Sequence, residues 1–236
     1  NPLGVRAEDR VDEFGAKARA HRERRDQRHD AQRDADGGDE KDEEHRPAER
    51  YGGQRHGVVA RVIQRGDADA MVAGGTEAAI SQAAVAGFGA RKALCMDHNE
   101  DPEHASRPFD KNRSGFVMGE GSGIVILESL AHAEKRGAHI YAEVAGYGSN
   151  SDAYHITAPK PTGEGAAQIA EQLVTKAGID FKDIDYINGH GTGTQANDKM
   201  EKNMFTKLFP STTLISSTKG QTGHTLGAAG IIELIN

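Results

Sequence analysis

Two glycine-rich segments carry the residues of this chain that are best suited to chemistry. The first places His190 within residues 189–194, and the second places Lys219 and His224 within residues 217–224. A histidine can donate or accept a hydrogen bond, and glycines let the backbone approach a substrate closely. A histidine in a turn is also commonly a cap or a surface residue, and neither segment fits the P-loop or GxGxxG pattern. The spacing alone therefore indicates an enzyme without defining its reaction.

The elements around these segments predict an α/β fold. Each segment follows a short apolar run that predicts a strand, and ligands of open α/β sheets bind outside the carboxyl ends of strands. Strands are expected at residues 69–75, 123–128, 140–147, 185–188 and 214–217, the first two of them buried. Helices are expected at residues 78–90, 164–177, 198–208 and 226–235. Strands that alternate with helices favour mostly parallel pairing.

Composition narrows the class of protein. The chain has 236 residues with a formal net charge of −7, so the basic footprint of a nucleic-acid or acidic-membrane partner is missing. No apolar run is long enough to predict a membrane span, and no secretory signal is visible. One cysteine excludes an intrachain disulfide framework and suits a reducing compartment. We expect a cytoplasmic protein.

The first 60 residues differ sharply from the rest. They contain 28 charged side chains, against 37 in the remaining 176 residues. Such a stretch cannot bury enough apolar surface to offset the entropy of ordering. Its mixed charges could still support a solvated helix through pairs four residues apart. We expect residues 1–60 to be disordered or a frayed helix, and residues 61–236 to form the packed domain.

Four motifs in residues 61–236 resemble the β-ketoacyl-acyl-carrier-protein synthase family. His-Gly-Thr-Gly-Thr at residues 190–194 is similar to the motif of the family's first catalytic histidine, and Ser-Thr-Lys with Gly-His at 217–224 to that of the second. Residues 66–78 resemble the strand after the nucleophile helix, and residues 107–121 the central signature. The likeness is greatest to the bacterial fatty-acid elongation type, and polyketide ketosynthases share the motifs.

The resemblance implies a decarboxylative Claisen condensation. Malonyl-acyl-carrier protein loses carbon dioxide, and the carbanion attacks an acyl thioester held on a cysteine. His190 and His224 would donate from Nε2 to the thioester oxygen, where negative charge develops. Lys219 would tune the electrostatics around His224, and Glu233 would orient the Lys–His pair. Thr192 and Thr194 would bind the phosphopantetheine arm; as alternatives, Lys219 and Glu233 are surface charges and the threonines cap a turn.

The resemblance also implies a fold and partners. The fold would be the layered αβαβα thiolase-like one, represented by the later part of its N-terminal half and the first part of its C-terminal half. Malonyl- and acyl-loaded acyl carrier protein would be the partner, and the chain would form a homodimer. No metal or redox cofactor is implied, since the phosphopantetheine arrives on the carrier protein.

The sequence departs from the family at the nucleophile. The family pattern places the cysteine near residue 49, at a helix N-terminus that would lower the thiol pKa, but this chain has Glu49 in a foreign context. Cys95 lies beyond the strand at 69–75 and is interpreted as structural or incidental rather than as the nucleophile. The family's last segment should follow well after Asn236, so the chain has the pattern of a fragment that is expected to leave its sheet open and prone to aggregate.

Two explanations of residues 1–60 and three functions stay open. The segment could be an out-of-frame translation of GC-rich coding sequence, which the nucleotides around codons 40–65 would test, or a genuine extension of a divergent homologue. The leading function is that of a condensing synthase whose present chain does not condense. The others are malonyl decarboxylation without condensation, and a non-catalytic subunit of the chain-length-factor type that pairs with an intact synthase.

Overall fold

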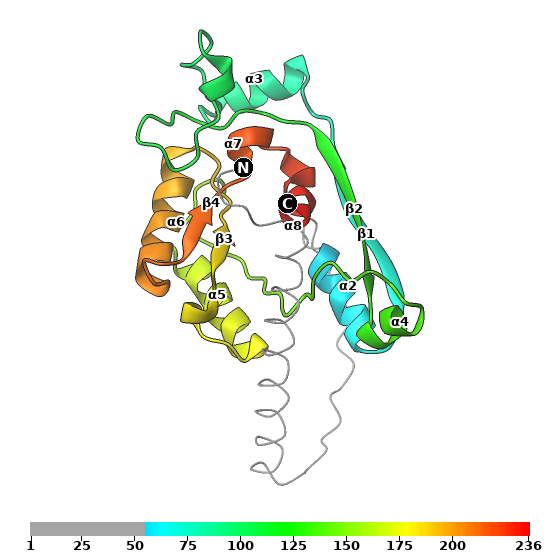
Figure 1. Cartoon of the computed structure of the whole chain (residues 1–236). Coiled ribbons are helices and arrows are strands. Elements are labelled where there is room, and N and C mark those ends of the chain that lie inside the picture. The colour runs from blue at the N-terminus through cyan, green and yellow to red at the C-terminus, as the bar shows by residue number, and fades with distance from the viewer. Residues whose placement is uncertain (1–54) are drawn as a thin grey trace, which may run out of the picture.

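The computed structural model describes residues 55–236, which form two small sheets and the helices that pack against them (Figure 1). Residues 1–54, which belong to the segment expected to be disordered or a frayed helix, lie outside the described residues, and so does the expected nucleophile position near Glu49. The strands are β1 (Ala70–Glu77), β2 (Gly121–Glu128), β3 (Tyr186–Asn188) and β4 (Leu214–Ser216). The helices are α2 (Arg55–Gln64), α3 (Gln82–Ala90), α4 (Leu130–Lys135), α5 (Glu164–Ala177), α6 (Gln195–Leu208), α7 (Lys219–Thr222) and α8 (Ala229–Ile235). Short 3₁₀ turns are η1 (Pro102–His104), η2 (Phe181–Asp183) and η3 (Leu226–Ala228).

The expected boundary at residue 60 falls inside a helix. Helix α2 begins at Arg55 and continues across residue 60 to Gln64. The expected boundary was based on the change in the density of charged residues, and this change does not mark the start of a helix. The division of the rest of the N-terminal segment stays a prediction.

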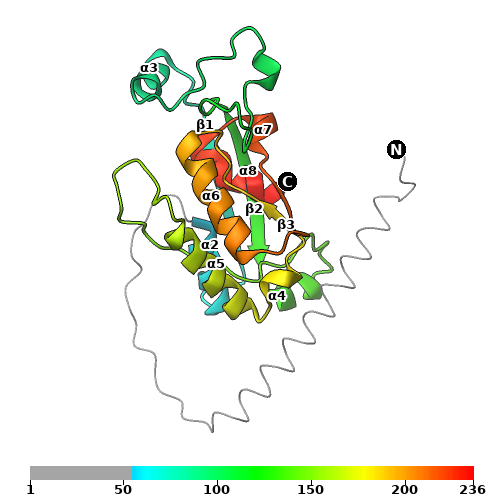
Figure 2. The ribbon, with the colours of Figure 1, turned by 90° about the vertical axis from the view of Figure 1, so that its left-hand side faces the viewer.

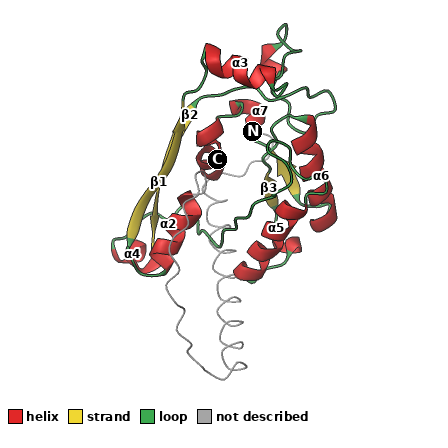
Figure 3. Ribbon diagram, turned by 180° about the vertical axis from the view of Figure 1, so that it is seen from behind, coloured by secondary structure: helices red, strands yellow, loops and turns green. Residues whose placement is uncertain are grey.

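Strands β1 and β2 pair antiparallel along their whole length, from Ala70 opposite Glu128 to Glu77 opposite Gly121. Helix α8 packs on one face of this ribbon, where glycines admit it closely: a Cβ atom on Gly123 would lie 2.9 Å from Cδ1 of Ile235. Figures 1 and 3 show α2 and α8 on the inner side of the ribbon. The expectation of mostly parallel pairing is therefore wrong for these two strands.

The opposite face of the β1–β2 ribbon is open. Val72, Ile124 and Ile126 point away from α8 and are 69%, 71% and 66% exposed. We expected both strands to be buried, and this expectation holds for one face only. Apolar runs predict a buried strand because helices often cover both faces of a sheet, but within the described residues only one face has a covering layer.

Strands β3 and β4 form the expected parallel pair, with Tyr186 opposite Leu214 and Asn188 opposite Ser216. Helices α5 and α6 lie beside this pair, as Figure 2 shows from the side. A small core forms here from Ala167, Met204 and Phe205, with Phe109 and Ile187 packed against it. This core holds β3 through Ile187, and the His190 segment begins at the end of that strand.

The predicted strand at residues 140–147 is absent, since this part of the chain runs as an irregular segment past α5. Tyr141 is 90% exposed there. Alternating side chains predict which face of a strand is buried, but a strand also needs a neighbouring strand to complete its hydrogen bonds. The described residues bring no such neighbour beside this segment. None of the described helices is long and apolar enough to cross a membrane.

Candidate active site

His190 lies in the turn between β3 and α6. The amide of Gly189 donates to the carbonyl of Ser216 at 2.8 Å, which extends the parallel ladder by one bond beyond β3. The next two amides, of His190 and Gly191, donate to the two carboxylate oxygens of Glu201, each at 2.7 Å. Glu201 is on α6 and is buried. The backbone that carries His190 is therefore held by both the sheet and the following helix.

His224 lies after α7, where Gly223 turns the chain with a φ of 65°. Its amide donates to the carbonyl of Val117 at 2.7 Å, and its carbonyl accepts from the amide of Gly119 at 3.0 Å. The imidazole packs edge-on against the ring of Phe116, with centroids 5.2 Å apart. Residues 116–119, from the first half of the chain, thus hold His224, which lies in the second half.

The two histidines face each other, with ring centroids 5.2 Å apart and an interplanar angle of 88°. Lys219 lies beside them and is 1% exposed. Its ammonium donates to the carbonyl of His190 at 2.8 Å, lies 3.2 Å from Nδ1 of the same ring, and forms an ion pair with Glu233. The structure therefore brings together all four residues that the sequence analysis selected as catalytic.

The pattern of donors defines the tautomer of each ring. The ammonium of Lys219 has only hydrogens to offer, so Nδ1 of His190 must accept from it. The amide of Leu226 donates to Nδ1 of His224 at 3.1 Å. In the neutral form, each imidazole therefore carries its hydrogen on Nε2. The site presents two N–H donors from facing rings.

Burial and a nearby positive charge keep both rings neutral. Desolvation, followed by the charges of Lys219 and His224, lowers the pKa of His190 to about 3. The residue keeps an exposed surface, so solvent screens part of this effect. Desolvation and Lys219 lower the pKa of His224 to about 4. We expected Lys219 to act around His224; its hydrogen bond is instead to His190, and only its charge reaches His224.

Thr192 and Thr194 lie in the turn that follows His190. Their hydroxyls are 2.8 Å apart and hydrogen-bonded, and the amide of Thr194 donates to the Thr192 hydroxyl at 3.3 Å. Thr192 is buried and Thr194 is half-buried. These bonds are those of a capped turn, which was the alternative interpretation; contact with a phosphopantetheine arm stays a prediction.

Sequence reasoning missed the acidic residues that support the histidine turn. Neither Asp198 nor Glu201 was selected as a site residue. Both are buried on the first turns of α6. Carboxylates at that end of a helix, directly after a glycine-rich turn with free amides, are a signal that could have identified them.

Sequence profiles place this site in a family. The profile described as "Beta-ketoacyl synthase, N-terminal domain" matches residues 56–133, and "Beta-ketoacyl synthase, C-terminal domain" matches residues 141–236. The second match contains both histidines, Lys219 and Glu233. The chain belongs to the β-ketoacyl synthase family.

Curated relatives show which share of a whole synthase this β-ketoacyl synthase chain covers. A 3-oxoacyl-[acyl-carrier-protein] synthase 2 from Rhizobium meliloti is 54% identical over 182 residues, which are 76% of this chain and 43% of the relative. One from Staphylococcus aureus is 51% identical over 182 residues, 76% of this chain and 45% of the relative. The chain thus spans less than half the length of these relatives.

Solved structures agree with the family. A ketosynthase in complex with its type II polyketide acyl-carrier protein is 39% identical, with a TM-score of 0.74 over 78% of this chain and 46% of that chain. A β-ketoacyl synthase from Burkholderia phymatum is also 39% identical, with a TM-score of 0.73 over 78% of this chain and 44% of that chain. These likenesses confirm the predicted fold class, an incomplete thiolase-like α/β fold.

The only cysteine of this β-ketoacyl synthase chain is held outside the histidine pair. Cys95 follows the isolated bridge between Leu94 and Phe116. Its thiol lies 3.6 Å from the carbonyl of Ala105 and accepts from the hydroxyl of Ser114 at 3.3 Å. These contacts fit the structural interpretation of Cys95.

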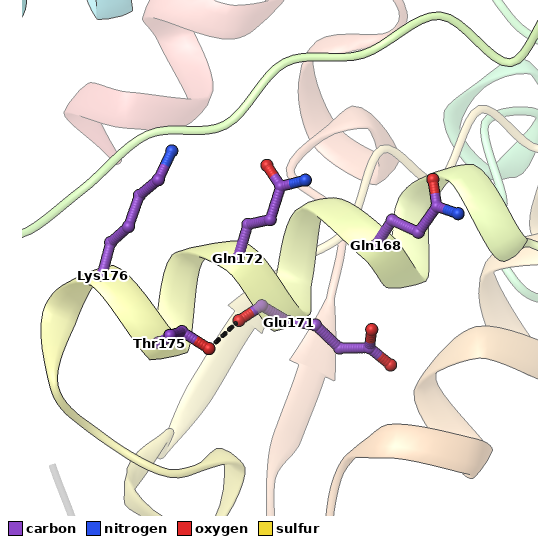
Figure 4. A pocket seen from close by; sticks show the side chains of 5 residues that line it. All are labelled: Gln168, Glu171, Gln172, Thr175 and Lys176. Carbon is purple, nitrogen blue, oxygen red and sulfur yellow. Dashed lines mark hydrogen bonds between the residues drawn. The ribbon is translucent and has the colours of Figure 1, made fainter.

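A shallow, open groove on α5 is separate from the histidine site. Its lining residues all come from one helix: Gln168, Glu171, Gln172, Thr175 and Lys176 (Figure 4). The hydroxyl of Thr175 donates to the carbonyl of Glu171 at 2.8 Å within that helix. None of the predicted site residues lines this groove, and no function is assigned to it.

Proposed function

We propose that this chain carries the oxyanion-binding part of a 3-oxoacyl-acyl-carrier-protein synthase that acts in fatty-acid elongation. The single observation that carries the proposal is the pair of neutral imidazoles, each directed by its Nδ1 contact to present an Nε2–H donor. Two such donors suit an oxygen on which negative charge develops. No metal or redox cofactor enters the proposed reaction.

The proposed reaction begins with the loss of carbon dioxide from malonyl-acyl-carrier protein. The electron pair of the breaking carbon–carbon bond becomes the carbon–carbon double bond of an enolate, and the thioester oxygen gains the negative charge. His190 and His224 donate hydrogen bonds to that oxygen. In a complete enzyme the enolate carbon attacks an acyl thioester, and the cysteine thiolate leaves. Without an acyl acceptor, the carbon takes a proton from water and yields acetyl-acyl-carrier protein.

The present chain is proposed to decarboxylate without condensing. Its one cysteine, Cys95, is engaged away from the histidines. Condensation requires an acyl group on a thiol beside the enolate, because the two carbons must meet at bonding distance. The partner is acyl carrier protein, and a homodimer in the cytoplasm is the proposed state of the complete enzyme.

Fatty-acid elongation is favoured over polyketide synthesis by sequence identity. The curated 3-oxoacyl-acyl-carrier-protein synthases are 51% and 54% identical to the chain over 76% of its length.

Incubation of the purified chain with malonyl-acyl-carrier protein tests the proposal. We expect acetyl-acyl-carrier protein by mass spectrometry, and its loss in His190→Ala and in His224→Ala. His155→Ala is a matched control, because His155 is exposed and contacts only Thr157 by hydrogen bonds that are described. Product no greater than that of the His190→Ala chain would contradict the proposal.

The open face of the β1–β2 ribbon favours one second candidate. Val72, Ile124 and Ile126 leave an apolar surface, and a solved ketosynthase/chain length factor is 37% identical with a TM-score of 0.69 over 78% of this chain. The chain could serve as a non-catalytic subunit that pairs with an intact synthase. Co-purification with a full-length synthase tests this role, and a chain that stays unassociated would count against it.

A further inference from the structure

The segment of residues 106–119 contacts the turns of both His190 and His224, although it lies far from them in sequence. It is called the bridging segment below. On the His224 side, Val117 and Gly119 exchange backbone hydrogen bonds with His224, and Phe116 packs on its ring. The hydroxyl of Ser106 donates to the carbonyl of Lys219 at 2.5 Å. The bridging segment is therefore in position to set the geometry of the pair.

On the His190 side, the main contact of the bridging segment is Arg113. Its Nε donates to the carbonyl of Thr194 at 3.2 Å, and Nη2 donates to the carbonyl of Gln195 at 3.2 Å. Nε also lies 3.4 Å from a carboxylate oxygen of Asp198. The amide side chain of Gln195 donates back to the Arg113 carbonyl at 2.5 Å. One guanidinium thus contacts the end of the turn at Thr194 and the first residues of α6 at Gln195 and Asp198.

Asp198 connects Arg113 to the turn that carries His190, because it contacts both. Its side chain is 1% exposed. It accepts from the amide of Gly193 at 3.2 Å and from the amide of Phe109 at 2.7 Å. A carboxylate this deeply buried needs a cation and hydrogen-bond donors to offset its desolvation. Among the described residues, Arg113 is the cation paired with it.

Phe109 is a further residue of the bridging segment that contacts the His190 turn. Its φ of 64° is in the left-handed region, which is sterically unfavourable for a residue that has a Cβ atom. The hydrogen bond to Asp198 holds this conformation. Its ring then lies against the turn, 2.9 Å from the place that a Cβ atom on Gly191 would take. A strained residue that is held by a buried carboxylate indicates that this conformation is specified by its surroundings.

We propose that Arg113 is a positioning residue of the active site: by holding Asp198 and the carbonyls of Thr194 and Gln195, it fixes the turn that aims His190 at His224. Arg113 itself contacts neither imidazole. The role of Arg113 in catalysis rests on the proposed function, because an oxyanion site needs both donors held at fixed positions before the charge develops.

Two variants separate this role from a simple effect of charge. Arg113→Ala removes both the charge and the hydrogen bonds, whereas Arg113→Lys keeps the charge and loses the planar set of donors. If Arg113 acted only through its charge, Arg113→Lys would leave His190 unchanged. The ionisable groups that contact or face His190, which are Lys219, Glu233, His224 and Glu201, are the same in every variant.

Nuclear magnetic resonance titration of the histidine side chains in the full chain provides the test. The His190 signal is assigned by its absence in His190→Ala. We expect the His190 pKa to rise by about 1 unit in both Arg113→Ala and Arg113→Lys, because a loosened turn exposes the ring to water. Arg136→Ala is the matched control, since Arg136 also pairs with a carboxylate, Glu128, and lies directly after α4, at the far end of the fold from α7 (Figure 1).

Each outcome decides the proposal. A folded Arg113→Lys chain with an unchanged His190 titration overturns it, and so does an Arg113→Lys chain that fails to fold, which would make Arg113 a residue of general stability. Malonyl decarboxylation is measured in parallel, with a lower kcat and a similar KM expected for Arg113→Lys. A native chain that does not decarboxylate would contradict the proposed function alone, because the titration reads the position of His190 without turnover.

Discussion

The ammonium of Lys219 lies 3.2 Å from Nδ1 of His190, and this contact decides which nitrogen of the ring carries the hydrogen. Lys219 is itself held by the carboxylate of Glu233 and the carbonyl of His190. A buried lysine that donates to a histidine makes that histidine a donor on its other side. Lys219 therefore acts on the chemistry of the site without having to touch the substrate.

Replacement of Lys219 by methionine should change the protonation of His190. Methionine has a similar length and no hydrogen to offer, so Nδ1 loses its donor and the ring should populate both tautomers. The pKa of His190 should rise toward its ordinary value of 6.5, because the nearby positive charge is gone. Nitrogen chemical shifts of the imidazole measure both changes. Lys176→Met on the exposed side of α5 is the control, and an unchanged His190 spectrum in Lys219→Met would contradict the assignment.

Replacement of Glu201 by glutamine should loosen the turn of His190. The two carboxylate oxygens accept from the amides of His190 and Gly191, and burial raises the pKa of Glu201. The glutamine side chain has one acceptor oxygen in place of two, because its NH₂ group cannot accept a hydrogen bond. One of the two buried backbone amides is therefore left unpaired, at a cost of ~1–3 kcal/mol. Urea unfolding measures the loss. The exposed Glu164, which pairs with Lys160, gives the matched control, since solvent screens that pair and its change to glutamine should leave the urea midpoint almost unchanged. Equal costs for the two variants would refute this account.

Sequence patterns predicted the elements near the site better than the sheet around them. Helix α5 coincides with the amphipathic pattern at residues 164–177, and β3 lies within the predicted 185–188. These elements are specified by local periodicity. The antiparallel direction of β2 and the missing strand at 140–147 depend on which distant segments meet, and local periodicity does not encode that. For the same reason, Arg113 was not selected: its partners at Thr194 and Asp198 are about 80 residues away.

Replacement of Gly191 by alanine should displace the His190 turn. Gly191 has a φ of 40°, and an added Cβ would lie 2.5 Å from Cβ of Ser217. Left-handed backbone alone costs ~1–2 kcal/mol for alanine, and the backbone must move further to relieve the overlap. We expect lower stability in urea and loss of malonyl decarboxylation. Gly87→Ala is the matched control with the opposite sign: Gly87 is in α3 with open space around it, and alanine there should add ~0.5–1 kcal/mol. Similar unfolding midpoints for Gly191→Ala and the native chain would contradict the described turn.

Acid should destabilise the chain through its two site histidines. In the folded chain the pKa values of His190 and His224 are lowered to about 3 and about 4, whereas both titrate near 6.5 when unfolded. Between these values the unfolded chain binds more protons than the folded one, so the free energy of unfolding falls as the pH drops below 6.5. We expect urea midpoints to fall from pH 7 to pH 5 in the native chain.

The chain with His190→Gln and His224→Gln should lose part of this pH dependence, because glutamine takes up no proton in either state. Glu201 opposes the histidines, since its raised pKa favours protonation of the folded chain, but it is present in both chains and its effect largely cancels in the comparison. The other nine histidines cancel in the same way. If the double variant and the native chain lose equal stability between pH 7 and pH 5, the two rings are already solvated in the folded state, and the neutral donor pair described above is not maintained by the fold.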